Sequence, residues 1–234
     1  MRTAEIVRST RLEEAARRRA PARDPRRQAF TLIEMLIVCS IIAVLAGLTM
    51  VGLQHARVSG QETACSVEVQ MICSRLQSLK NAFGDFPPTS LADIKIKGNN
   101  INEGNESLFA FLLSKKRGGP FADDLKEDRW CNTDNDAVQG GDLKIVEKEI
   151  LWTRGNAQLL EYMDLWGTPY VYIHSRDYGK RYKYQLDDGT VFEAEAKKNP
   201  ATGTYYSPTT FQLWSLGRDS VNQNGEGDDI VSWK

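Results

Sequence analysis

The sequence predicts an α+β fold, in which a long N-terminal membrane-spanning spine helix packs on a small head with an antiparallel sheet. Three patterns lead to this prediction: an uncharged apolar stretch, an apolar stripe after it, and a C-terminal third with strand signals. The uncharged stretch covers 19 residues, from Met35 to Leu53. A helix needs about 20 apolar residues to cross a bilayer, so this stretch is long enough to span one.

The helix is expected to continue beyond the membrane segment, because apolar residues recur at helical spacing. Intervals of 4, 3, 4, 3 and 4 separate the members of this stripe: Cys65, Val69, Ile72, Leu76, Leu79 and Phe83. Gly84 is a suitable C-terminal cap, and Pro87 and Pro88 cannot continue a helix. An unbroken helix over residues 30–83 would be about 80 Å long at a rise of 1.5 Å per residue.

The C-terminal third carries the strand signals. Residues 166–173 are a turn followed by aromatic and β-branched residues, and residues 181–186 and 211–215 alternate in polarity. They predict three or four antiparallel strands on the helix stripe, with the Trp and Tyr side chains in the core. Before them, residues 98–160 have the least regular pattern, with a polar loop over 98–105 and a short helix expected over 107–116, capped by Ser107.

The entrance of the apolar stretch carries the most specific motif. Ala29 precedes Phe30-Thr31-Leu32-Ile33-Glu34, and an acid at a membrane edge requires a partner. This string closely resembles the class III signal of type IV pilins and type II secretion pseudopilins. The resemblance implies cleavage between Ala29 and Phe30, methylation of Phe30, and pairing of Glu34 with the N-terminus of a neighbouring subunit. Ala29 stands where the family usually has Gly.

Three other interpretations of this region are weaker. A twin-arginine export signal fits Arg26-Arg27 followed by Phe30, but its apolar region should not begin with Glu. An ordinary secretory signal has a shorter apolar segment of about 7–15 residues and a small-residue cleavage site at its end. A plain membrane anchor explains the length of the stretch but not the Phe-Thr-Leu-Ile-Glu string.

Charge predicts the orientation in the membrane. Residues 1–29 hold nine Arg and four acids, a net charge of +5, and such a segment stays cytoplasmic. The whole chain has a net charge of −1, so the remainder has −6. We therefore expect a single-pass inner-membrane protein with a periplasmic head. An acidic head does not favour nucleic-acid binding, which requires a basic face.

Two strings in the head resemble major pseudopilins. Residues 164–170, Asp-Leu-Trp-Gly-Thr-Pro-Tyr, resemble the string that opens their sheet, with Leu165 in place of Pro. Residues 215–233 resemble their terminal calcium loop, with Ser220 in place of Gly. The resemblance implies calcium ligation by the carbonyl groups of Leu216 and Val221, by the carboxylate of Asp219, and by a later carboxylate from Glu226, Asp228 or Asp229.

Alternatives to this calcium loop stay open. The loop does not fit the EF-hand register, and an acidic turn without metal has the same composition. Residues 132–136, Asn-Thr-Asp-Asn-Asp, are a second stretch that can offer oxygens to a cation, although such runs are usually solvated loops.

No arrangement of residues indicates an enzyme. The two His are isolated, and no nucleophile with its base and no phosphate-binding loop is legible. Cys65 and Cys73 are separated by about 12 Å of helix rise and cannot bond each other. Either of them can pair with Cys131, whereas Cys39 lies in the membrane stretch.

The resemblance implies a structural subunit of a type II secretion pseudopilus, which supports export of folded proteins across the outer membrane. The implied partners are further copies of the chain, other pseudopilins, the prepilin peptidase and the inner-membrane assembly platform. The expected divisions are a leader (1–29), a membrane half (30–53) and a periplasmic half (54–84) of the spine helix, and the head (85–234). Compared with a minimal pseudopilin, the head has an inserted loop region at about 98–160, and it ends in the calcium loop 215–233. The alternatives are a minor type IV pilus subunit and a membrane-anchored calcium-binding surface protein that does not polymerise.

Overall fold

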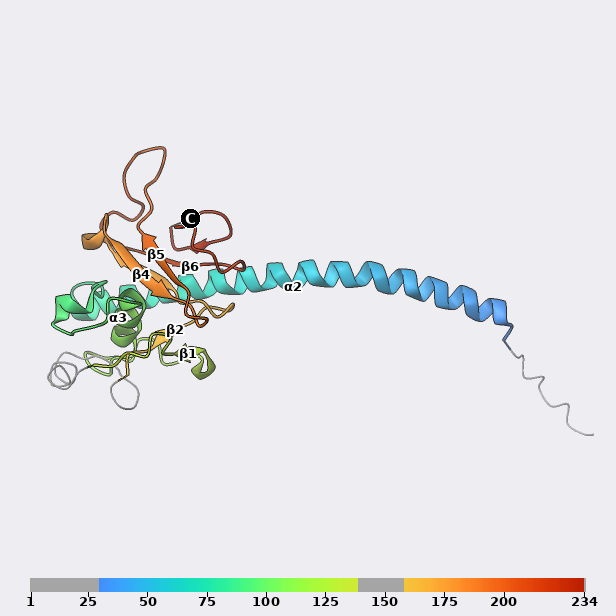
Figure 1. Ribbon diagram of the computed structural model, residues 1–234, viewed down its shortest axis with the longest axis horizontal. Helices are drawn as coiled ribbons and strands as arrows, with labels where there is room; N and C mark the ends of the chain where they lie inside the picture. Colours follow the sequence, from blue (N-terminus) through green and yellow to red (C-terminus); the bar gives the residue numbers. More distant parts are fainter. Residues whose placement is uncertain (1–29, 139–157, 234) are drawn as a thin grey trace, which may run out of the picture. The chain divides into compact units, whose positions relative to one another are not determined.

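A computed structural model of the chain describes residues 30–138 and 158–233 (Figure 1). The predicted leader and its last residue, Ala29, lie outside these residues, as does part of the predicted insertion. The chain divides into two compact units, Met1–Leu53 and Gln54–Lys234. The α+β fold class and its pilin-like arrangement, a long apolar N-terminal helix followed by helices and small antiparallel sheets, are confirmed.

The long helix is α2, Leu32–Phe83, with 52 residues. Its first part, Leu32–Met50, is long and apolar enough to cross a membrane. The helix ends where the sequence predicts, because Gly84 adopts a φ of +93° and its N–H donates to the carbonyl oxygen of Lys80 at 2.7 Å. A residue with a side chain adopts this left-handed conformation only at a cost, so Gly is favoured there.

The predicted stripe of α2 is buried in the head. Cys65, Val69, Ile72, Leu76 and Leu79 are at most 1% exposed. They pack with apolar side chains of the following helix and strands, among them Leu108, Phe109, Tyr170 and Leu213. The large aromatic side chains are in the core, as predicted: Tyr162, Tyr170, Tyr172, Tyr184 and Trp214 are fully buried.

Within residues 85–138 and 158–233, the head contains three small antiparallel sheets. One pairs β1 (Trp130–Cys131) with β2 (Glu161–Tyr162), and another pairs β4 (Arg181–Gln185) with β5 (Val191–Glu195). The third has the order β3-β6-β7, from β3 (Val171–His174), β6 (Phe211–Ser215) and β7 (Ile230–Val231). The strands predicted after Trp166, from Arg181 and over 211–215 are therefore confirmed, but the described residues hold seven strands instead of the three or four predicted.

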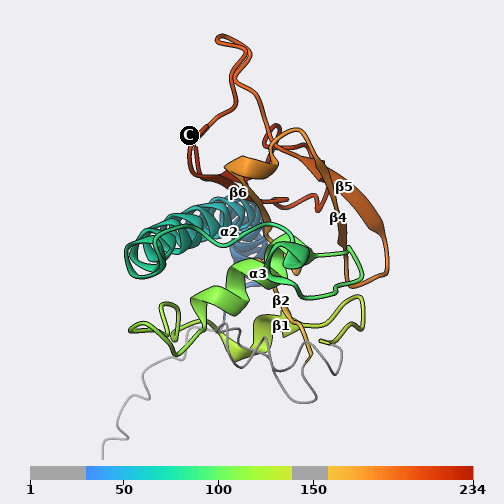
Figure 2. The same ribbon diagram turned by 90° about the vertical axis from the view of Figure 1, so that its left-hand side faces the viewer.

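Short helices connect these sheets. The 3-10 helices are η1 (Leu91–Ile94), η2 (Glu127–Arg129) and η3 (Ser175–Asp177), and α3 is Glu103–Leu112. Helix α3 contacts β2, β3 and β4 and lies in the middle of the head (Figure 2).

The predicted bounds and cap of this helix were wrong. Helix α3 begins four residues before Ser107, after Asn102 in a left-handed conformation with a φ of +55°. Ser107 is buried inside the helix, where its hydroxyl donates to the carbonyl oxygen of Pro88 at 2.6 Å. The polar residues before Ser107 favour a loop when considered alone, but the head supplies Asn102 and Asn105 with hydrogen bonds. The Asn105 side chain, for example, donates to the carbonyl oxygens of Tyr162 and Tyr170.

A polar cluster binds α2 to the rest of the head. Arg129 forms a bidentate ion pair with Glu68 of α2, with distances of 2.9 and 2.8 Å. The hydroxyl groups of Tyr162 and Tyr170 donate to the same carboxylate at 3.1 and 2.7 Å. Burial raises the pKa of Tyr162 to about 12, so this hydroxyl group remains a donor at neutral pH. We call Glu68, Arg129, Tyr162 and Tyr170 the Glu68 cluster.

The thiols of Cys39, Cys65, Cys73 and Cys131 are free in the structure. Cys65 is buried in the stripe, and Cys73 is partly buried on the same helix. Burial raises the pKa of Cys65 to about 11 and that of Cys73 to about 12, so both stay protonated at neutral pH.

Candidate functional site

The first turn of α2 is held by its own side chains. The carboxylate of Glu34 accepts hydrogen bonds from the N–H and the hydroxyl group of Thr31, both at 2.8 Å. The Glu34 N–H donates to the Thr31 hydroxyl oxygen at 3.3 Å. This reciprocal pattern is a capping box, which satisfies N–H groups that the first turn of a helix leaves unpaired.

The capping box gives Glu34 a local role that our sequence reasoning missed. The signal was present, because Thr-x-x-Glu before an apolar run is the sequence pattern of this cap. Both hydrogen bonds from Thr31 use Oε2 of Glu34. The cap fixes the first turn of the helix and with it the direction of the Glu34 carboxylate.

The residues around this cap are exposed and apolar. Phe30 is 73% exposed, and Leu32, Ile33 and Leu36 are exposed as well. A contiguous apolar surface of this kind is buried in a membrane or against other helices. Phe30, the predicted methylated residue, therefore lies at the start of a helix face that has no partner within the described residues of the chain.

The turn at residues 164–170 is organised by one buried carboxylate. Asp164 accepts hydrogen bonds from the N–H groups of Trp166 and Thr168, both at 2.9 Å, and from the Thr168 hydroxyl group at 2.7 Å. The hydroxyl group of Ser215 on β6 donates to the same carboxylate at 2.5 Å. Asp164 thus joins the turn before β3 to the strand that leads into the terminal loop.

The carboxylates of the terminal loop bind its own main chain. Asp219 Oδ1 accepts from the Val221 N–H at 2.8 Å, and Asp228 Oδ2 accepts from the N–H groups of Arg218 and Asp219 at 2.9 and 3.1 Å. Asp229 Oδ2 accepts from two further N–H groups of the loop, at 3.1 and 2.7 Å. The loop is therefore closed by carboxylates at both of its ends.

Asp229 differs from the other acids of this loop. It is buried, and its Oδ1 has no hydrogen-bond partner among the described residues. Burial raises the pKa of Asp229 to about 6, and the nearby charges of Asp228 and Asp219 act in the same direction. Of the three alternatives for the later carboxylate, Asp229 is the one with a buried oxygen free to accept a ligand.

The other predicted ligands of the loop have different surroundings. Leu216 is fully buried in the core, whereas the Val221 side chain is exposed. Glu226 forms an ion pair with Lys197 at 2.5 Å. Ser220, which stands where the resembling family has Gly, adopts a left-handed φ of +57°. Within residues 30–138 and 158–233, the group of three carboxylates that lie close enough together to share one metal ion is found elsewhere in the head, not in this loop.

That compact group is Glu106, Asp134 and Asp136. Residues 132–136 were recognised as possible cation ligands, but Glu106 was missed because it lies in α3, which was predicted to begin later. A helical projection from Asn102 would have revealed it, since Glu106 is three residues before the buried Phe109 and lies on the same face.

The comparison with protein families places a known motif at the N-terminus. Residues 24–50 match the prokaryotic N-terminal methylation motif. Neither the comparison with curated proteins nor that with solved structures gave a match. The matched range includes the predicted cleavage site, Phe30, the capping box and most of the apolar stretch. The chain thus carries a class III prepilin motif at the start of a long apolar helix and has the α+β arrangement of type IV pilin-like proteins.

Proposed function

We propose that this chain is a structural subunit of a type II secretion pseudopilus. In this role a prepilin peptidase cuts between Ala29 and Phe30 and methylates Phe30, and the subunit then polymerises with other pseudopilins on an inner-membrane platform. The observation that carries the proposal is the methylation motif over residues 24–50, at the start of a helix whose later residues form the core stripe of the head.

Features of the head favour a pseudopilin within the pilin-like class. The Asp164 turn and the terminal loop with Asp219, Asp228 and Asp229 are the parts that resemble major pseudopilins. We propose that the terminal loop binds calcium through Asp219 and Asp229 and through the carbonyl groups of Leu216 and Val221. The buried Oδ1 of Asp229, which has no partner among the described residues, supports this assignment.

Intact-mass measurement of the membrane-extracted protein tests the processing step. We expect a mature chain that begins at Phe30 and carries one added methyl group. A mature start near Ala46 or Gly60 would indicate a conventional signal peptide and refute the proposal. Recovery of the mature chain in sheared filaments separates a polymerising subunit from a membrane-anchored surface protein, which would stay in the membrane fraction.

Two substitutions of Glu34 separate its local role from its proposed role in assembly. Glu34→Gln keeps an oxygen that can accept from Thr31 and removes the charge, whereas Glu34→Ala removes both. If Glu34 pairs with the N-terminus of a neighbouring subunit, both variants are cleaved and inserted but assemble poorly. If only the cap matters, Glu34→Gln assembles normally and Thr31→Ala assembles as poorly as Glu34→Ala.

A minor subunit of a type IV pilus is the second candidate. It shares the N-terminal motif, so processing does not distinguish it. Deletion of the gene for this chain in its host distinguishes the two candidates. Loss of secreted proteins from the medium supports the pseudopilus, and loss of surface pili with normal secretion supports the pilus.

A further inference from the structure

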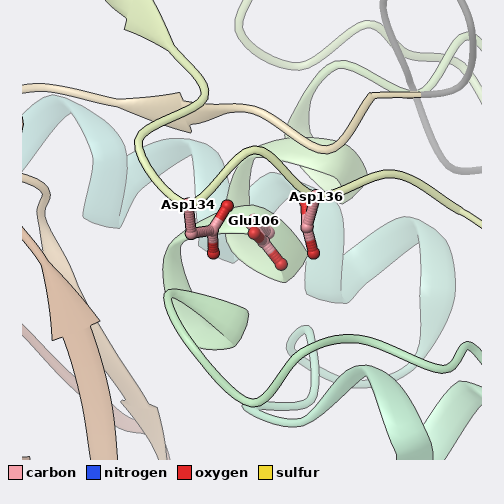
Figure 3. Close-up of side chains that lie close together, drawn as sticks. All are labelled: Glu106, Asp134 and Asp136. Carbon is pink, nitrogen blue, oxygen red and sulfur yellow. The ribbon is translucent and has the colours of Figure 1, made fainter. Parts of the chain in front are cut away.

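The head contains a compact acidic group that is distinct from the terminal loop. Glu106 comes from α3, and Asp134 and Asp136 come from the loop that follows β1. One oxygen of each carboxylate lies within 4.8 Å of the others. Figure 3 shows the carboxylate of Glu106 between those of the two aspartates. We call these three residues the head cluster.

Five of the six carboxylate oxygens of the head cluster have no hydrogen-bond partner among the described residues. Glu106 is 1% exposed, and neither of its carboxylate oxygens has a hydrogen-bond partner among the described residues. The same is true of both oxygens of Asp134 and of Oδ1 of Asp136. Buried carboxylates are normally hydrogen-bonded, paired with a cation or bound to a metal. These oxygens therefore point to a ligand that the described residues do not supply.

The surrounding charges repel one another. Burial raises the pKa of Glu106 well above its ordinary value, and the charges of Asp136, Glu161 and Asp134 raise it further. Burial, together with the charge of Asp134, also raises the pKa of Asp136 to about 7. A bound cation would remove this repulsion, because it interacts favourably with each carboxylate at short range in a region of low dielectric constant.

The main chain around the head cluster is held in place by hydrogen bonds. Glu161 on β2 accepts from the Thr133 N–H at 3.0 Å and from the Asn102 side chain at 3.1 Å. The Asn132 side chain donates to the carbonyl oxygen of Asp136 at 2.8 Å and accepts from its N–H at 3.0 Å. Glu161 and Asn132 are therefore positioning residues, and little ordering of the loop is needed when a ligand binds.

We propose that the head cluster binds one divalent cation and that this cation is Ca²⁺. The ligands are carboxylate oxygens, which hard cations prefer, whereas zinc sites use Cys and His. Two oxygens on opposite sides of Ca²⁺ lie about 4.6–5.2 Å apart, since each Ca–O distance is about 2.3–2.6 Å. One oxygen from each carboxylate of the head cluster lies within 4.8 Å of the others, which is close enough for all three to bind one such ion. Mg²⁺ has shorter bonds and retains several waters, for which the fully buried carboxylate of Glu106 leaves little room.

This site is independent of the filament role and of the proposed calcium loop. The proposed cation site is tested with four proteins, each a full mature chain in detergent. Calcium binding is measured by calorimetry, and the melting temperature is measured with and without calcium. The four proteins are the wild type, Glu106→Gln, Asp219→Asn for the terminal loop, and Asp123→Asn as a control at an exposed acid. Asp136→Asn, at a partly exposed position of the loop, tests the same site if Glu106→Gln does not fold.

The head cluster is expected to bind one calcium ion, and Glu106→Gln should weaken that binding by at least about tenfold because one of three charges is lost. Asp219→Asn and Asp123→Asn should retain it. At free calcium about 100 times the Kd, the melting temperature of the wild type should rise by roughly 5–10 °C. At the same concentration, magnesium should raise it less.

A reversal between the two conditions identifies a metal site specifically. In chelator, Glu106→Gln should melt higher than the wild type, since at neutral pH the buried Glu106 must either take up a proton on folding or remain charged without a partner, and Gln avoids both costs. In calcium it should melt lower. The proposal is overturned if Glu106→Gln melts lower than the wild type by the same amount in both conditions, or if it retains the calcium stoichiometry and affinity of the wild type. Equal stabilisation by magnesium would overturn the assignment to calcium.

Discussion

Glu68 is the residue whose removal should most weaken the attachment of α2 to the rest of the head. It accepts hydrogen bonds from Arg129, Tyr162 and Tyr170. The side chains of Arg129 and Glu68 are only 12% and 18% exposed. The Glu68→Ala substitution leaves the guanidinium group of Arg129 without its counter-charge and two buried hydroxyl groups without their acceptor.

The size of the expected loss of stability in Glu68→Ala follows from the type of interaction that is removed. Breaking a buried ion pair by removing one partner costs about 3–5 kcal/mol, because the other charge stays buried and unpaired. Arg129 keeps one partner, since its guanidinium group also donates to the carbonyl oxygen of Met163 at 2.7 Å. We therefore expect Glu68→Ala to lower the free energy of unfolding by about 3 kcal/mol, at the lower end of that range.

Urea denaturation of the full mature chain in detergent, monitored by near-ultraviolet circular dichroism, measures this change in the free energy of unfolding. Glu62→Ala is the matched control, because Glu62 is an exposed acid on the same helix, and exposed substitutions usually change stability by less than about 0.5 kcal/mol. A loss below about 1 kcal/mol for Glu68→Ala, or a loss equal to that of Glu62→Ala, would show that the Glu68 cluster does not stabilise the head.

Three further substitutions test other parts of the head. Asp164→Ala should cost roughly 2–4 kcal/mol in urea denaturation, because it leaves the buried donors of Thr168 and its neighbours without an acceptor; no measurable loss would refute this. Ser220→Gly should raise the melting temperature, since it relieves a left-handed φ at a gain of up to about 1 kcal/mol, and a decrease would contradict it. Burial and the charge of Arg176 lower the pKa of His174 below its ordinary value of 6.5. The unfolded chain therefore binds a proton at His174 more tightly than the folded chain, and the free energy of unfolding should fall as the pH drops below about 6.5. In His174→Asn, which can still accept from the Arg176 N–H, this fall should be smaller between pH 7 and 5.

Local patterns in the sequence were sufficient for the outline of the fold. The stripe from Cys65 to Phe83 predicted the buried face of α2, and Gly84 predicted its end. Helical spacing and a capping glycine act within a few residues, so they can be recognised without knowledge of distant contacts. The same is true of the N-terminal motif, whose parts are adjacent in the chain.

The start of α3 was missed because its stabilisation is not local. Asn102, Asn105 and Glu106 are polar, and without partners such residues favour a loop. In the structure, main-chain groups and side chains more than 50 residues away in sequence satisfy Asn102 and Asn105. This tertiary contribution outweighs local preference, as it often does for short helices.

Sequence patterns alone were enough to predict the apolar stretch, the prepilin motif, the stripe and the strands β3, β4 and β6, because each is a pattern of neighbouring residues. The ion pair of Glu68 with Arg129 and the position of Glu106 between Asp134 and Asp136 depend on the tertiary structure and could not be predicted in this way. The partners of a buried polar group come from distant parts of the chain, and its energy depends on which of them are present. Acids that appear in the sequence as separate surface charges therefore become, after folding, a buried ion pair in one place and a candidate cation site in another.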